Sequence, residues 1–130
     1  MTTNFSANPN YFIMDYAPYI QKLRERKAQE KALAENKRQH ALNVAREIAA
    51  VLKRNFSAQR VILFGSVLSS ERFHSRSDID IAVAGIPSKK FFAAYGHVLD
   101  IAKQFNLDLI DLNACRPTLS ATIEAEGIEL

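Results

Sequence analysis

Two acidic residues separated by one apolar residue form the pattern in this chain with the clearest chemical meaning. Asp78 and Asp80 lie in the run Ser77–Val83, whose other members are mostly apolar. Side chains alternate along a β-strand, so both carboxylates are expected on one face, with the intervening apolar residues on the other. Carboxylates side by side on a partly buried strand repel each other unless protons or cations neutralise them. Because oxygen ligands favour Mg²⁺ or Mn²⁺ over Zn²⁺, the pattern predicts a divalent metal site.

A glycine–serine turn precedes this acidic pair. The apolar run Val61–Phe64 predicts a strand that ends at Gly65 and Ser66. Glycine can take a positive φ and let a phosphate approach the backbone, while the serine offers its N–H and hydroxyl. Such turns are common, and only the order of apolar strand, turn and acidic strand indicates a nucleotide site.

A third carboxylate lies on a later strand-like run, Leu107–Leu112. Asp108 is flanked there by apolar residues, whereas Asp111 lies three positions further on and should face the opposite way. We therefore assign Asp108 to the metal. Three carboxylates on neighbouring strands can hold two metal ions roughly 3.5–4 Å apart, one activating an attacking hydroxyl and the other holding a triphosphate.

Helices and strands alternate around these residues. We expect Val67–Phe73 to form a short helix or turn, a helix to begin at Pro87-Ser88, and another to run over Pro117–Glu126. Gly127 is expected just after the C-cap of that last helix, before a terminal strand over residues 128–130. The first helix of the domain and the helix after Pro87 are predicted from apolar residues at steps of three and four. These residues are Ala41, Val44, Ala45, Ile48, Val51 and Leu52, and then Phe91, Phe92, Tyr95, Val98, Leu99 and Ala102.

The first 40 residues have a different composition and are predicted to form an N-terminal helical extension, with the main domain over residues 41–130. The segment Gln21–His40 contains strong helix formers but only Leu23 and Leu33 as large apolar residues, which predicts a solvated helix. An aromatic patch precedes it and is expected to be an interface, for a second copy of the chain or for a partner protein. The patch includes Tyr11, Phe12, Tyr16 and Tyr19.

Length and composition indicate one globular domain with this extension. The chain has 130 residues, 48% of them hydrophobic, which excludes general disorder and supports a modest core. A net charge of +3 permits contact with nucleic acid without requiring it. The single cysteine, Cys115, cannot form an internal disulfide, and we find neither a signal-peptide core nor a membrane span. We therefore expect a cytoplasmic protein without a membrane partner.

The three acidic residues and the glycine–serine turn resemble the DNA polymerase β-like nucleotidyltransferase superfamily. Within it they resemble the minimal nucleotidyltransferases that occur with HEPN-type toxins, over roughly residues 41–130. The resemblance implies an α+β (mixed α/β) fold with a polymerase β palm-like core and a small mixed sheet. It also implies roles for the matching residues: metal binding and catalysis by Asp78, Asp80 and Asp108, and triphosphate binding by Gly65 and Ser66.

Many members of this superfamily follow the glycine–serine pair with a small residue, an arginine and a glycine. This chain has Val67-Leu68-Ser69-Ser70-Glu71-Arg72 instead. Arg72 or Arg76 would then supply the positive charge near the phosphates, because a guanidinium suits phosphate geometry.

The resemblance implies transfer of AMP from ATP, with Mg²⁺ or Mn²⁺, onto a hydroxyl. A minimal domain lacks a large acceptor-binding part, which favours an acceptor brought by another chain, such as a HEPN-type toxin neutralised by the modification. Two alternatives stay open at this point. One is a non-catalytic antitoxin that neutralises its toxin by contact, and the other is an adenylyltransferase with a small-molecule acceptor.

Overall fold

The computed structural model describes residues 9–130, with side chains described from residue 16 onward. Two compact units share the chain, one ending at Leu33 and the other running over Ala34–Leu130. A single helix, α2 (Pro9–Phe56), contributes to both. Within residues 9–130, no helix combines the length and the apolar content that crossing a bilayer requires.

The first unit consists of the N-terminal part of α2. Every described side chain from residue 16 to residue 33 is exposed, which confirms the predicted solvated helix. Tyr16 and Tyr19 are 51% and 61% exposed. The side chains of Tyr11 and Phe12, the other members of the predicted aromatic patch, lie outside the described residues.

The second unit is built on a four-stranded sheet in the order β3-β2-β1-β4. Strand β1 runs antiparallel to both β2 and β4, whereas β2 and β3 are parallel. The predicted α+β fold with a small mixed sheet is therefore confirmed. Its elements after α2 are β1 (Arg60–Phe64), the short 3₁₀ helix η1 (Ser66–Leu68), β2 (Ile79–Ala84), α3 (Ser88–Ala102), β3 (Leu107–Asp111), α4 (Pro117–Glu126) and β4 (Ile128–Glu129).

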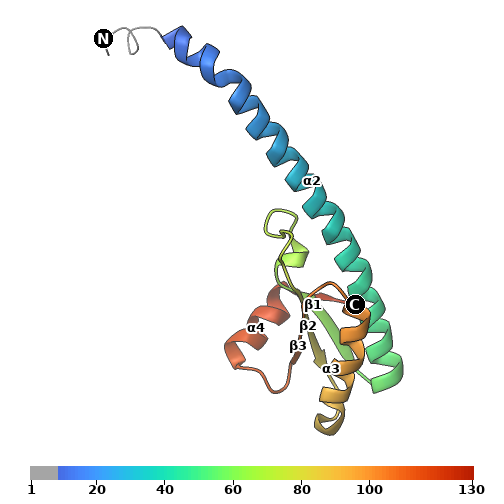
Figure 1. Cartoon of the computed structure of the whole chain (residues 1–130). Helices are drawn as coiled ribbons and strands as arrows, with labels where there is room; N and C mark the ends of the chain where they lie inside the picture. Colours follow the sequence, from blue (N-terminus) through green and yellow to red (C-terminus); the bar gives the residue numbers. More distant parts are fainter. Residues whose placement is uncertain (1–8) are drawn as a thin grey trace. The chain divides into compact units, whose positions relative to one another are not determined.

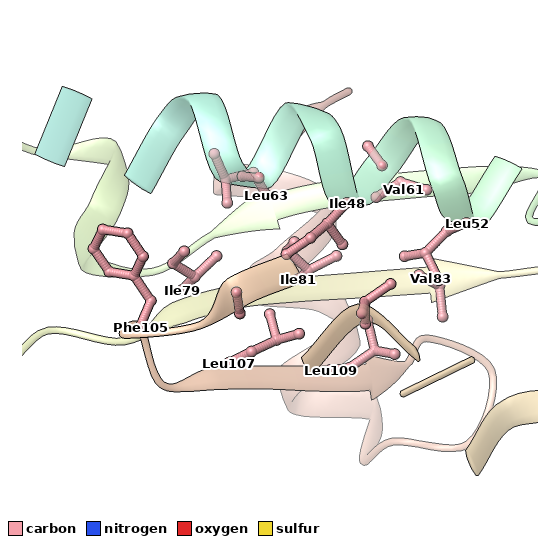
Figure 2. Packing of buried hydrophobic residues seen from close by; sticks show 14 of the residues in the cluster. Ile48, Leu52, Val61, Leu63, Ile79, Ile81, Val83, Phe105, Leu107 and Leu109 are labelled. Carbon is pink, nitrogen blue, oxygen red and sulfur yellow. The ribbon is translucent and has the colours of Figure 1, made fainter. Parts of the chain in front are cut away.

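Helices cover both faces of this sheet. The C-terminal part of α2 and helix α3 lie on one face and α4 on the other (Figure 1). The larger core lies beneath α2, where Ile48 and Leu52 pack on side chains of the first three strands (Figure 2). The predicted apolar stripe of this helix is confirmed, since Ala41, Ala45 and these two residues are fully buried. Burial of aliphatic side chains on a shared face is what fixes α2 and the sheet together.

The predicted apolar face of α3 is only partly correct. Val98 and Ala102 are buried, together with Ala94, but Phe92 is 81% exposed and Leu99 is 46% exposed. A helix that packs on one sheet face buries a single stripe, and these two residues lie beside it. The sequence pattern therefore predicted a broader buried face than the sheet can cover.

Gly127 also differs from expectation. It is itself the C-cap of α4, with an extended backbone at φ −74° rather than a left-handed one. A Cβ at this position would lie 2.4 Å from Cγ2 of Ile62 and 2.6 Å from the carbonyl oxygen of Ile123. Glycine is required here because the chain turns from α4 into β4 directly against β1.

Candidate active site

The sheet places two of the predicted carboxylates next to each other. Asp80 on β2 is opposite Asp108 on the parallel strand β3, and opposite Phe64, the last residue of β1, on the other side. Asp78 lies one residue before the start of β2 and is exposed. The predicted alternation is confirmed on the opposite face, where Ile79 and Ile81 are fully buried.

The carboxylate face is the one that α4 partly covers. Ala82 follows Asp80 on this face and packs with Ile62, Leu112 and Ile123 in a small second core. Asp80 and Asp108 therefore lie at one end of a face whose other part is closed by α4. Asp111 is on the alternate face of β3, and its carboxylate accepts a hydrogen bond from the backbone N–H of Asn113 at 3.0 Å.

The environment of Asp80 favours its protonated form. Burial raises the pKa of this carboxyl to about 6, and the negative charges of Asp108 and Asp78 raise it further in the same direction. Within residues 16–130, no lysine, arginine or histidine forms an ion pair with any of these three carboxylates. The site is thus a partly desolvated concentration of negative charge, which a cation would stabilise.

Gly65 brings the turn after β1 against this carboxylate. Its backbone has φ 84° and ψ −161°, a conformation that residues with a Cβ rarely adopt. A Cβ at Gly65 would lie only 2.2 Å from Oδ2 of Asp80. The turn continues as a 3₁₀ helix, closed by hydrogen bonds from the N–H of Leu68 to Gly65 and from the N–H of Ser69 to Ser66.

The two candidate phosphate-binding arginines occupy different positions in the loop that follows. The guanidinium of Arg72 donates a hydrogen bond of 3.4 Å to the carbonyl oxygen of Gly65, so the structure brings this side chain to the turn. Arg76 is exposed, and its backbone N–H donates to Nδ1 of His74 at 3.2 Å. In the described part of the chain, the guanidinium of Arg76 makes no hydrogen bond or ion pair.

The carboxylates act on one another without forming a complete metal site by themselves. Among the described residues, no group of three or more Asp, Glu, His and Cys side chains is close enough to hold a metal ion. Asp80 and Asp108 are nevertheless neighbours in the sheet, and Asp78 is near enough to raise the pKa of Asp80. The geometry thus brings two carboxylates together and leaves Asp78 at the margin. Oxygen donors of this kind suit a hard cation that completes its coordination with phosphate oxygens and water.

Sequence reasoning missed two residues that hold the loop between β1 and β2. Lys37 and Arg38, both on α2, donate hydrogen bonds to the carbonyl oxygens of Ser75 and Val67. Both belong to a run of charged residues that indicated only a solvated helix face. Nothing in their spacing reveals a contact to a segment about 30 positions away, because the contact depends on how α2 packs on the sheet.

Comparison with known proteins agrees with this geometry. The model of the Polymerase beta nucleotidyltransferase family matches residues 46–130. The chain therefore belongs to this family, and its domain is that of a nucleotidyltransferase. No curated protein matches the chain.

Several solved structures share the fold. One toxin–antitoxin structure with AMP-PNP is 28% identical, with a TM-score of 0.53 over 65% of this chain and 70% of that chain. The MntA-HepT toxin–antitoxin structure is 23% identical, with a TM-score of 0.51 over 68% of this chain and 69% of that one. A mutant of such a pair with two aspartates changed to glutamate is 25% identical, with a TM-score of 0.51 over 65% and 70% of the two chains.

Proposed function

We propose that this nucleotidyltransferase transfers AMP from ATP to a hydroxyl group, with Mg²⁺ or Mn²⁺, and that the acceptor lies on a partner toxin of the HEPN type. The observation that carries the proposal is the row of Asp80 and Asp108 across β2 and β3, with the Gly65 turn against it. This combination joins a cation-binding face to a backbone turn open to phosphate.

Each element of the site has a distinct part in the proposed reaction. The acceptor oxygen bonds to the α-phosphorus of ATP, the bond from that phosphorus to the bridging oxygen breaks, and pyrophosphate leaves. Asp108 orients the acceptor hydroxyl and takes its proton. Gly65 and Ser66 hold the pyrophosphate side, with Arg72 close enough to neutralise charge there.

The carboxylates are suited to divalent metal. Asp80, Asp108 and Asp78 would supply oxygen ligands, and the triphosphate would supply others, so the metal and the nucleotide would bind together. A bound Mg²⁺ would polarise the phosphate and lower the pKa of the attacking hydroxyl. The raised pKa of Asp80 supports this role, because a cation relieves the repulsion that Asp108 and Asp78 exert on it.

A protein acceptor is favoured by what the fold offers and by its neighbours. The described residues beyond the arm form one small domain, which leaves little room for a separate acceptor pocket. Similar structures are toxin–antitoxin complexes, one of them with AMP-PNP. We place this activity in the cytoplasm, where ATP and Mg²⁺ are abundant, and we assign partner or self-association to the exposed arm.

A second candidate is a non-catalytic antitoxin that acts by contact alone. The observation that favours it is the marginal position of Asp78, since no three acidic side chains converge in the described part of the chain. This candidate predicts partner binding without nucleotide binding. An adenylyltransferase with a small acceptor is the remaining alternative, and no structural observation favours it.

Calorimetry with Mg²⁺ and ATP separates these candidates. The proposal predicts weak binding of Mg²⁺ alone and stronger binding together with ATP. Replacing both Asp78 and Asp80 by asparagine should remove most of the Mg²⁺–ATP affinity while the domain stays folded. Asp100→Asn, on the exposed surface of α3, is the matched control and should bind like the wild type. Unchanged affinity in the double variant would show that the metal assignment is wrong.

A further inference from the structure

Two consecutive residues of α2 hold the loop that carries the glycine–serine turn. Arg38 donates through Nε to the carbonyl oxygen of Val67 at 2.8 Å, and Lys37 donates through Nζ to the carbonyl oxygen of Ser75 at 2.6 Å. Val67 follows Ser66 directly, and Ser75 lies near the other end of the loop, shortly before β2. The loop between β1 and β2 is thus attached to the same helix at both ends.

Arg38 is itself held in place by its helical neighbours. Its Nη1 donates to both carboxylate oxygens of Glu35, at 3.0 and 3.3 Å, and Gln39 donates to the same carboxylate at 2.8 Å. The hydrogen bond from Gln39 and the guanidinium of Arg38 lower the pKa of Glu35, which keeps this carboxylate ionised. The Arg38 side chain is only 16% exposed. Its guanidinium therefore meets Val67 from a fixed direction.

The 3₁₀ turn that Arg38 contacts has little else to hold its backbone. Two backbone hydrogen bonds, accepted by Gly65 and Ser66, close the turn. The buried side chain of Val67 anchors its middle. A charge-assisted bond to the Val67 carbonyl is stronger than a neutral one and fixes the orientation of this peptide group. The orientation of the Ser66 N–H and hydroxyl depends on the same backbone.

We propose that Arg38 is a positioning residue for the triphosphate: it fixes the Gly65–Leu68 turn in the geometry that binds phosphate. This inference rests on the proposed function. Arg38 acts through the backbone and makes no contact with Asp80 or Asp108 among the described residues, so its loss should weaken nucleotide binding without changing the carboxylates. Lys37 supports the far end of the loop, and its ammonium lies 5.7 Å from the ring centre of Phe105.

Two variants and a matched control test this assignment. Arg38→Gln removes the charge and shortens the side chain, while Arg38→Lys keeps a charged donor. Arg54→Gln is the control, because Arg54 is exposed and its Nε donates at 3.4 Å to the carbonyl of Ala50 within α2 itself. Thermal unfolding first establishes that each variant is folded.

Hydrogen exchange reads the turn directly, and calorimetry reads its use. In Arg38→Gln the amides of Leu68 and Ser69 should exchange about tenfold faster, and the Kd for Mg²⁺–ATP should rise about tenfold, as expected for loss of one charge-assisted hydrogen bond. Arg38→Lys should restore part of both effects, and Arg54→Gln should show neither. A purely structural role would lower thermal stability without this selective loss of nucleotide affinity.

Three results would overturn the inference. Unchanged exchange at Leu68 and Ser69 in Arg38→Gln would show that the contact does not hold the turn. Wild-type nucleotide affinity in Arg38→Gln, with faster exchange, would show that the turn is held but that phosphate binding does not need it. Absence of Mg²⁺–ATP binding by the wild type would instead refute the proposed function, and the positioning role with it.

Discussion

Asp80→Asn should make the metal-free protein more stable at neutral pH. The substitution keeps the size and shape of the side chain and removes a charge that the native structure disfavours. Burial and the neighbouring carboxylates raise the pKa of Asp80 from its ordinary 3.8 to about 6. The unfolded chain therefore releases the proton of this group near pH 4, whereas the native protein retains it until about pH 6.

The direction and size of the effect follow from this difference. Between pH 4 and pH 6 the native state binds more protons than the unfolded state, so the free energy of unfolding falls as the pH rises. The full pKa difference corresponds to about 3 kcal/mol, at about 1.4 kcal/mol per tenfold change in the dissociation constant. Asp80 is partly exposed, and solvent screening reduces this to about 1–2 kcal/mol. Asp80→Asn should therefore exceed the wild type by about 1–2 kcal/mol above pH 6 and match it near pH 4.

Urea unfolding at pH 4, 6 and 8 without divalent cations measures this difference, with Asp100→Asn as the exposed control. Added Mg²⁺ and ATP should reverse the order at pH 8, because a ligand that binds only the native wild type stabilises it by mass action. Equal stability of Asp80→Asn and the wild type at pH 8 would refute the electrostatic reasoning. So would a variant that is less stable there than at pH 4 relative to the wild type.

Three further predictions concern other parts of the fold. Gly65→Ala should abolish Mg²⁺–ATP binding in calorimetry and lower the thermal midpoint, because its Cβ would meet Asp80 and its φ of 84° is unfavourable; binding at the wild-type level would contradict the role of the turn. Ile123→Ala should lower the free energy of unfolding by about 2–4 kcal/mol in urea, since this fully buried side chain joins α4 to the sheet; a loss below about 1 kcal/mol would show that α4 contributes little. Tyr19→Ser combined with Ile20→Ser should reduce oligomeric mass or partner affinity in light scattering and calorimetry, because both side chains are exposed on the arm; unchanged mass and affinity would exclude an interface there.

The strands and their faces were predictable because period-two alternation is a local property. It separated Asp80 from the buried Ile79 and Ile81, and it separated Asp108 from Asp111. The register that puts Asp80 opposite Asp108 was not readable from residue spacing. It depends on pairing between strands that a whole helix separates in the chain, and the family resemblance was what suggested their proximity.

The features that were missed depend on tertiary packing. Phe92 belongs to the same apolar repeat as Val98, and only the position of α3 on the sheet decides which of them is covered. Gly127 was expected to end α4 by its conformational freedom, whereas its lack of a side chain against Ile62 is what the structure requires. Arg38 was one charge in a charged run, and its bond to Val67 exists only after α2 has packed on the sheet.

The most direct test of the proposed chemistry follows the label of ATP. The purified protein, its partner toxin and Mg²⁺ are incubated with ATP labelled either at the α-phosphate or at the γ-phosphate. Label from the α-position should become covalently attached to the toxin, label from the γ-position should appear in pyrophosphate, and Asp108→Asn should abolish the transfer. Absence of α-label on the toxin while the two proteins still bind each other, or transfer that persists in Asp108→Asn, would contradict the proposed mechanism.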